Sequence, residues 1–260
     1  MDGSISREDL RKRQGDILGP LLIDVRVAAS FRAAQSAIAR AIRRDPDRVA
    51  DWAPHLEIGR TAVVYCDDGT ESAAVAEALR RRGLAAMHLD GGFAGWRADE
   101  LPVTVKPAAP SRWVTRERPK VDRIACPWLI RRFIDPDAQF LYVPLAEVPV
   151  VAAQTRAVPF DVPAVELGHV ADRCSFDAFI LKYRLRDPAL DRLADIVRGA
   201  DTGRPELTAQ SSGLLALSAG LSAIFDDDQR QLRHGLVVYD ALYAWCRVQA
   251  GAARSLGADA

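Results

Sequence analysis

The sequence predicts an α/β protein whose first half is a parallel sheet flanked by helices and whose second half is a helix-rich α+β domain. Short β-branched runs alternate with a helical segment in the first half, which is typical of a parallel sheet. Helical spacing dominates the second half. Between the halves, residues 104–112 contain two prolines and no apolar period, as interdomain linkers do. We expect a first domain at 1–105, a linker at 106–111, a second domain at 112–249 and a flexible tail at 250–260.

The strands of the first half are expected at residues 21–25, 61–65 and 85–89, each an aliphatic or β-branched run. A helix is expected over 71–82, because alanines and Leu79 recur on one side and three arginines precede Gly83. Cations in the last turn and a following glycine are typical of a helix C-terminus. A strand, a helix and a strand in succession predict a parallel pair.

The second half is expected to contain two strands, at 112–116 and 139–143. Pro188 follows Asp187, a good pair for the first helical position and its N-cap. By the same argument Pro127 makes Cys126 the N-cap of a helix. The expected helices cover residues 127–134, 176–184, 188–200, 212–225 and 229–248.

Charge and cysteine content narrow the class of protein. Of 260 residues, 35 are Lys or Arg and 35 are Asp or Glu, so the net charge is +0, which argues against nucleic acid as the main partner. The N-terminal residues lack the apolar core of a secretory signal, and the weakly polar run at 213–225 is too short to span a bilayer. The four cysteines form no CxxC pair, which argues against a zinc ribbon or a disulfide scaffold. We therefore expect a cytoplasmic protein with no membrane insertion.

Cys66 is the candidate nucleophile, because it directly follows the strand at 61–65 and precedes a helix. Successive backbone N–H groups and a helix N-terminus favour a thiolate at such a junction, and Gly69 lets the loop curl around the sulfur. The alternative is a small core residue at a strand end. The strand–cysteine–loop–helix context favours the nucleophile.

Residues 15–103 resemble the rhodanese family of sulfurtransferases. The resemblance rests on the segments Ile23–Arg26, Tyr65–Ser72 and Asp90–Trp96. It implies that Cys66 takes up a sulfane sulfur as a persulfide, from a donor and for an acceptor that the sequence does not identify. It also implies that backbone N–H groups of residues 67–72, including those of Gly69 and Ser72, cradle this sulfur, and that Asp24 supports the site from a neighbouring strand end.

The loop differs from the family pattern in its charge. It carries Asp67, Asp68 and Glu71, where the family commonly has arginine at the last loop position. Like charges oppose a thiolate and repel the thiosulfate dianion, so thiosulfate turnover should be weak. A phosphatase or arsenate reductase on the same scaffold needs an arginine to clamp the oxyanion, and Glu71 with Ser72 argues against both.

The second half holds two groups of candidate binding residues. Guanidinium groups near a helix N-terminus suit an oxyanion, and the alternative is an amphipathic helix with its arginines in water. The anion-site candidates are Arg123, Cys126, Arg131 and Arg173. No cofactor is certain, and the candidate is a metal ion, for which the alternative is a polar loop before a helix capped by Asp177. The metal-site candidates are Glu166, His169, Asp177 and His234.

Residues 112–247 resemble the chromate-resistance protein family. The resemblance rests on the segments 122–144, 166–169, 172–177, 198–201 and 234–243. It implies a protein that senses or handles chromate or a related oxyanion, joined here to a module with a persulfide-forming cysteine. One alternative is a sulfurtransferase whose second domain selects the acceptor. Another is a chromate-responsive regulator that binds promoter DNA, although the neutral charge counts against it.

Overall fold

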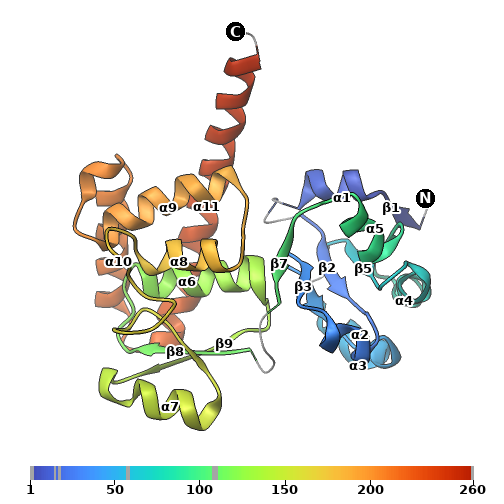
Figure 1. Ribbon diagram of the computed structural model, residues 1–260, viewed down its shortest axis with the longest axis horizontal. Helices are drawn as coiled ribbons and strands as arrows, with labels where there is room; N and C mark the ends of the chain where they lie inside the picture. The colour runs from blue at the N-terminus through green and yellow to red at the C-terminus, as the bar shows by residue number, and fades with distance from the viewer. Residues whose placement is uncertain (1–2, 15, 17–18, 57–58, 107–110, 259–260) are drawn as a thin grey trace. The chain divides into compact units, whose positions relative to one another are not determined.

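The computed structural model describes residues 3–14, 16, 19–56, 59–106 and 111–258. The chain divides into two compact units (Figure 1). The first comprises Met1–Lys106 with Phe133–Pro136, and the second comprises Pro107–Arg132 with Asp137–Ala260. Residues 107–110 of the expected linker lie outside the described residues.

The first unit contains a parallel sheet of five strands in the order β1-β6-β5-β2-β4. The register places Leu21 opposite Ala62 and Asp24 opposite Tyr65, so β2 and β5 end together. A separate antiparallel pair joins β3 to β7. The parallel sheet predicted from the sequence is therefore confirmed. The strands are β1 (Ser4–Ile5), β2 (Leu21–Asp24), β3 (Ser36–Ile38), β4 (Ile42–Arg43), β5 (Ala62–Tyr65), β6 (Ala86–Leu89) and β7 (Val103–Val105).

Helices cover both faces of this sheet, because successive strand residues point to opposite sides. Val64 packs with residues of α3 and α4, whereas Val63 packs with residues of α1 and α5 (Figure 1). Both valines are completely buried. The helices are α1 (Arg7–Arg13), α2 (Ala28–Ala33), α3 (Val49–Trp52), α4 (Thr70–Arg80) and α5 (Gly92–Ala98), with 3-10 turns at Pro46–Arg48 and Ala53–His55.

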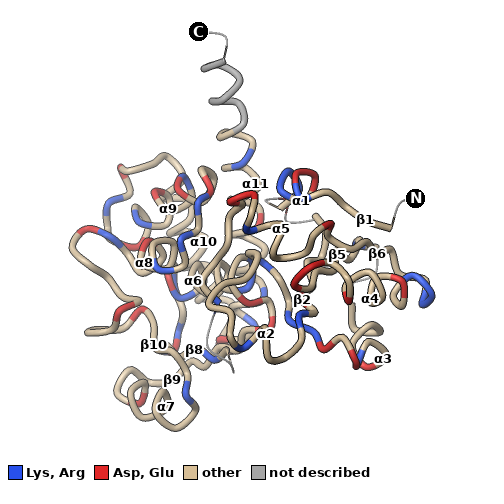
Figure 2. The backbone as a smooth tube through the Cα atoms, turned by 45° about the vertical axis from the view of Figure 1, so that its right-hand side comes forward, with Lys and Arg blue, Asp and Glu red and all other residues tan. Residues whose placement is uncertain are grey.

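The second unit is a small parallel sheet, in the order β10-β8-β9, with a helix-rich remainder. The long helix α11 packs against α9 and α6, and acidic and basic segments are interspersed along the unit (Figure 2). The strands are β8 (Arg112–Arg116), β9 (Gln139–Val143) and β10 (Val158–Pro159). The helices are α6 (Asp122–Leu129), α7 (Val148–Thr155), α8 (Ser175–Lys182), α9 (Pro188–Asp201), α10 (Ser211–Ile224) and α11 (Asp228–Ala258), with a π turn at Ile130–Ile134 and 3-10 turns at Leu145–Glu147 and Pro205–Leu207.

The last helix of the second unit is longer than the sequence predicts, and α7 and β10 were not predicted. The helix expected over 229–248 extends from Asp228 to Ala258, and its last turns contain several alanines, which are strong helix formers. Among the described residues, no helix combines the length and the apolar composition needed to cross a membrane.

Cys126 is not a helix N-cap, because α6 begins at Asp122 and includes both Cys126 and Pro127. Pro127 has no N–H, so the carbonyl of Arg123 loses the donor that the helix would supply. The hydroxyl of Tyr142 donates to this carbonyl at 2.9 Å instead. A donor from β9 therefore lets a proline lie inside the helix, where local sequence predicts a helix start.

The hydrogen bond from Tyr142 to the Arg123 carbonyl predicts that substitutions of Tyr142 and Pro127 have coupled effects on stability. Tyr142→Phe should lower the free energy of unfolding of the second unit by about 1 kcal/mol, because a buried carbonyl is left without a donor. In a Pro127→Ala background the cost should be smaller, because the new N–H of residue 127 can reach the same carbonyl. Urea unfolding of the four variants measures this coupling. An equal cost in both backgrounds would contradict the compensation.

Candidate functional sites

The sulfur of Cys66 lies in a loop of backbone donors at the start of α4. The Cys66 Sγ accepts the N–H groups of Gly69 at 3.1 Å and Ser72 at 3.4 Å, and lies 3.5 Å from the Ser72 hydroxyl. The first N–H groups of a helix have no partner within it, so the Ser72 N–H is free to point at the sulfur. These donors favour negative charge on Cys66, which is fully buried.

Two glycines give this loop its shape. Gly69 has φ of 104°, in the left-handed region that favours glycine. At Gly92 a Cβ atom would lie 2.7 Å from both the Cys66 carbonyl oxygen and the Gly69 nitrogen. This close approach lets Phe93 donate its N–H to the Cys66 carbonyl at 2.9 Å. The start of α5 therefore fixes the backbone of the cysteine loop.

Asp24 contacts Tyr65, the residue before Cys66. Its buried carboxylate accepts the Tyr65 hydroxyl at 2.9 Å and the Arg26 guanidinium at 2.6 Å. Arg26 is itself buried, with its guanidinium carbon 4.3 Å from the centre of the Phe93 ring. Sequence reasoning named Asp24 but missed this Arg26–Tyr65 link, although both residues lie in the segments that carry the rhodanese resemblance.

Carboxylates surround the sulfur, as the loop sequence predicts. Asp68 Oδ1 lies 3.7 Å from the Cys66 Sγ, and Cys66, Asp68 and Glu71 each offer one atom to a group within 4.8 Å. The Thr70 backbone N–H donates to Asp68 and lowers the pKa of this exposed carboxyl. Asp68 therefore stays ionised at neutral pH. An anionic sulfur donor that approaches Cys66 meets the negative charge of this carboxylate.

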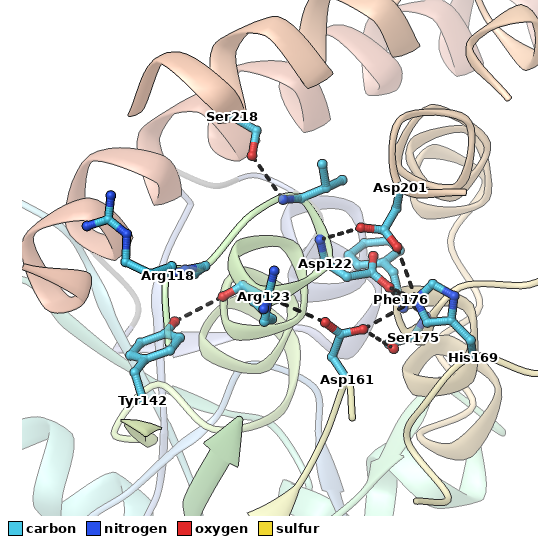
Figure 3. A network of polar contacts seen from close by, with 12 residues as sticks. Arg118, Asp122, Arg123, Tyr142, Asp161, His169, Ser175, Phe176, Asp201 and Ser218 are labelled. Carbon is cyan, nitrogen blue, oxygen red and sulfur yellow. Dashed lines mark hydrogen bonds and ion pairs between the residues drawn. The ribbon is translucent and has the colours of Figure 1, made fainter. Parts of the chain in front are cut away.

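Four side chains from distant segments meet in the second unit (Figure 3). Asp122 begins α6, Asp161 follows β10, His169 lies in the loop before α8, and Asp201 ends α9. The His169 Nε2 lies 3.6 Å from Asp122 Oδ2, 3.3 Å from Asp161 Oδ1 and 3.0 Å from Asp201 Oδ2. We call these four residues the Asp122 cluster.

The N-terminus of α8 holds this cluster in place. Asp122 Oδ2 accepts the backbone N–H of Ser175 at 2.6 Å and that of Phe176 at 3.3 Å. The Ser175 hydroxyl donates to Asp161 at 2.7 Å, and the Asp122 N–H donates to Asp201 at 3.3 Å. Two carboxylates are thus oriented by the first residue of one helix (Figure 3).

Charge in the Asp122 cluster is crowded. Burial raises the pKa of Asp122 well above its usual range, and Asp201 and Asp161 add to the effect. Burial and the neighbouring Asp161 also raise the pKa of Asp201. The pKa of His169 is raised, first by its hydrogen bond with Asp161. The arrangement therefore favours a positive charge at the position that the three carboxylates face.

The structure places the predicted metal-site residues differently from the sequence prediction. His169 belongs to the Asp122 cluster, but Glu166 forms an ion pair with Lys182. Asp177 accepts the Cys174 N–H at 3.0 Å and the Arg198 guanidinium at 2.7 Å, which is the capping role of the alternative interpretation. His234 stacks on Phe225, with ring centres 4.5 Å apart. Sequence proximity grouped Glu166 and Asp177 with His169, whereas the fold gives each another partner.

The predicted anion-site residues also lie in different surroundings. Arg123 is buried with its Nε 3.6 Å from Asp161, and Arg131 donates to the Ala138 carbonyl at 3.3 Å. Cys126 lies in the core, where burial raises the pKa of its thiol well above its usual range. Arg173 lines a pocket of about 860 Å³ together with Arg198 and Lys182. They do not form the single anion site that the sequence suggested.

Sequence reasoning missed Asp122, Asp161 and Asp201 as members of one site. Asp122 and Asp201 lie in segments that carry the resemblance of the second half, but they are 79 positions apart. No local spacing links them. The sequence did indicate a site of this kind, because Asp and His residues recur in several segments of the second half.

Comparisons with known proteins agree with the division of the chain into two units. Residues 6–99 match the rhodanese-like domain, and residues 113–246 match the model described as ChrB, C-terminal domain. Protein ChrB of Cupriavidus metallidurans is 36% identical over 133 residues, 51% of this chain and 40% of that protein. The thiosulfate sulfurtransferase GlpE of Pseudomonas savastanoi pv. phaseolicola is 32% identical over 89 residues, 34% of this chain and 82% of that protein.

A solved rhodanese-related protein from Thermoplasma volcanium is 28% identical, covers 38% of this chain and 95% of its own, and superposes with a TM-score of 0.35. The family match at residues 6–99 shows that the first unit is a rhodanese-like domain. The chain as a whole belongs to the chromate-resistance family of ChrB, whose C-terminal domain model covers half of it. It spans 40% of the length of the ChrB relative.

The two sulfur environments predict an order of thiol reactivity. A limiting amount of iodoacetamide at neutral pH should modify Cys66 first, because backbone N–H groups stabilise its thiolate. Burial raises the pKa of Cys126 and Cys174, and that of Cys246 to about 11, so these thiols should react more slowly. Peptide mass spectrometry gives the order, with Cys66→Ser as the control. Modification of Cys246 before Cys66 would contradict it.

Proposed function

We propose that this chain is a cytoplasmic chromate-resistance protein in which Cys66 carries sulfane sulfur and the second unit senses or handles chromium. The observation that carries the proposal is the pair of N–H groups on the Cys66 sulfur, in a chain of the ChrB family. A free thiol at Cys66 suits a reducing compartment, where thiols are kept reduced.

The sulfur-transfer step needs a thiolate at Cys66. The thiolate attacks the outer sulfur of a donor such as thiosulfate, so that a new S–S bond forms. The S–S bond of the donor breaks, and sulfite leaves with its electron pair. The Gly69 and Ser72 N–H groups then face the negative persulfide, which they stabilise as fixed donors. An acceptor thiolate removes the outer sulfur and regenerates Cys66.

The second unit supplies groups that suit both forms of chromium. Chromate is a tetrahedral dianion, and a guanidinium group such as that of Arg173, which lines the pocket, binds oxyanions with paired hydrogen bonds. The reduced product is a hard trivalent cation that prefers carboxylates over thiolates. These chemistries support chromate or a related oxyanion as the partner of this unit.

The second candidate function is a sulfurtransferase whose second unit selects the acceptor. The match to GlpE favours it, because this relative is named as a thiosulfate sulfurtransferase and aligns over 82% of its length. The two functions differ in whether Cys66 is needed for chromate resistance.

Loop charge gives the first test of the sulfur-transfer step. Glu71→Arg should raise kcat/KM for thiosulfate by roughly threefold to tenfold at low salt, mainly through KM, because one repulsive charge becomes attractive. Glu71→Gln should fall between the two, and high salt should shrink the gain. Steady-state kinetics at two ionic strengths measure this. A gain that is absent at low salt would show that loop charge does not limit the reaction.

Chromate resistance gives the second test, because it separates the two units. In a deletion strain, Cys66→Ala should retain most resistance, whereas His169→Ala or Arg123→Ala should lose it, since both residues lie at the Asp122 cluster. The minimum inhibitory chromate concentration is measured, with protein levels checked by immunoblot. Loss of resistance in Cys66→Ala at a normal protein level would favour the sulfurtransferase instead.

A further inference from the structure

We propose that the Asp122 cluster binds one divalent transition-metal ion of the manganese, iron and zinc class, through Asp122, Asp161, His169 and Asp201. The proposal concerns a resident ion and does not depend on chromate or on Cys66.

The spacing of the four ligand atoms suits a shared ion. One atom from each residue lies within 4.8 Å of all the others. The His169 Nε2 is 3.0 to 3.6 Å from one oxygen of each carboxylate. Two donors that each lie ~2.1 Å from a common ion, at angles of ~90° to ~120°, are separated by about 3.0 to 3.6 Å. The three separations between His169 and the carboxylates therefore already match those that coordination requires.

A buried oxygen without a partner is an independent sign of a ligand. Asp122 is completely buried, and its Oδ1 has no hydrogen-bond partner, while Oδ2 accepts two backbone N–H groups. The carboxylate lies between Asp201 and His169 in Figure 3. A buried carboxylate oxygen left unpaired is costly, and a bound cation is a recognised partner for it.

The proton of one histidine nitrogen cannot serve the three carboxylates that face it. The His169 Nε2 carries at most one proton, yet three carboxylate oxygens converge on it. Arg123 adds one positive charge, 3.6 Å from the Asp161 carboxylate. A divalent ion together with Arg123 would balance the three carboxylates and leave His169 as a neutral ligand.

The donor set indicates the class of ion. Three carboxylates and one imidazole offer oxygen and nitrogen but no sulfur, which suits Mn²⁺, Fe²⁺ or Zn²⁺ better than a thiophilic ion. Asp122 and Asp201 lie in helices and Asp161 follows β10, and Ser175 orients Asp122 and Asp161. The His169 side chain is 45% exposed, which gives the ion a path from solvent.

Manganese binding tests the proposal in the full-length protein. Protein stripped with EDTA is titrated with Mn²⁺, and bound metal is measured by equilibrium dialysis with elemental analysis. We expect one Mn²⁺ ion per chain. Pulsed EPR should show a hyperfine coupling between this ion and the imidazole nitrogen of His169. Asp122→Asn and His169→Ala should each weaken binding by at least about tenfold, and the nitrogen coupling should disappear in His169→Ala. Circular dichroism checks the fold, and the half-exposed His169 provides a variant that does not disturb the core.

Three variants serve as matched controls. Glu166→Gln and His234→Ala remove candidate ligands that lie outside the cluster, and Cys66→Ala removes a ligand of the other possible metal group. All three should keep one ion with unchanged affinity. The proposal is overturned if the wild-type chain binds no Mn²⁺ or Zn²⁺ at millimolar concentration. It is also overturned if folded His169→Ala and Asp122→Asn bind as tightly as the wild type.

Discussion

The second unit is organised around the buried carboxylate of Asp122. A carboxylate removed from water must be compensated by donors or by positive charge, or it takes up a proton. Here the backbone N–H groups at the start of α8 hold one of its oxygens. Asp161, His169 and Asp201 then meet at this point from three other segments. The requirement to compensate one buried charge thus brings together β10, α6, α8, α9 and the loop before α8.

In the first unit, backbone N–H groups at a helix start hold the sulfur of Cys66 in the way that those of α8 hold Asp122. Unpaired N–H groups at the start of α4 point at the sulfur of Cys66, as those of α8 point at the carboxylate of Asp122. In both places backbone N–H groups at the start of a helix donate to a side chain that a strand end or another helix presents. The chemistry differs because a thiolate is a nucleophile, whereas a fixed carboxylate is a ligand or a charge. Each unit therefore has its own site, and each site depends on its own helix N-terminus.

Contiguous patterns were predictable from the sequence, and sites assembled from distant segments were not. The three long strands of the first sheet and the helix after Asp187 follow from local residue patterns. The two-residue strands β1, β4 and β10 are too short to show a period. The helix start predicted at Pro127 was wrong, because the hydroxyl of Tyr142 supplies the hydrogen-bond donor that the proline lacks. Tyr142 is distant from Pro127 in sequence. The Cys66 loop was found because its parts are consecutive, whereas the Asp122 cluster spans 79 positions.

The central claim is that the compensation of Asp122 is completed by a metal ion. A crystal of the full-length protein soaked in Mn²⁺, with diffraction recorded on both sides of the manganese absorption edge, tests this most directly. The account predicts one anomalous peak at about 2.0 to 2.3 Å from atoms of Asp122, Asp161, His169 and Asp201. A difference map with no peak there, while the four side chains keep their positions, would contradict it and leave His169 and Arg123 as the counterions of the three carboxylates.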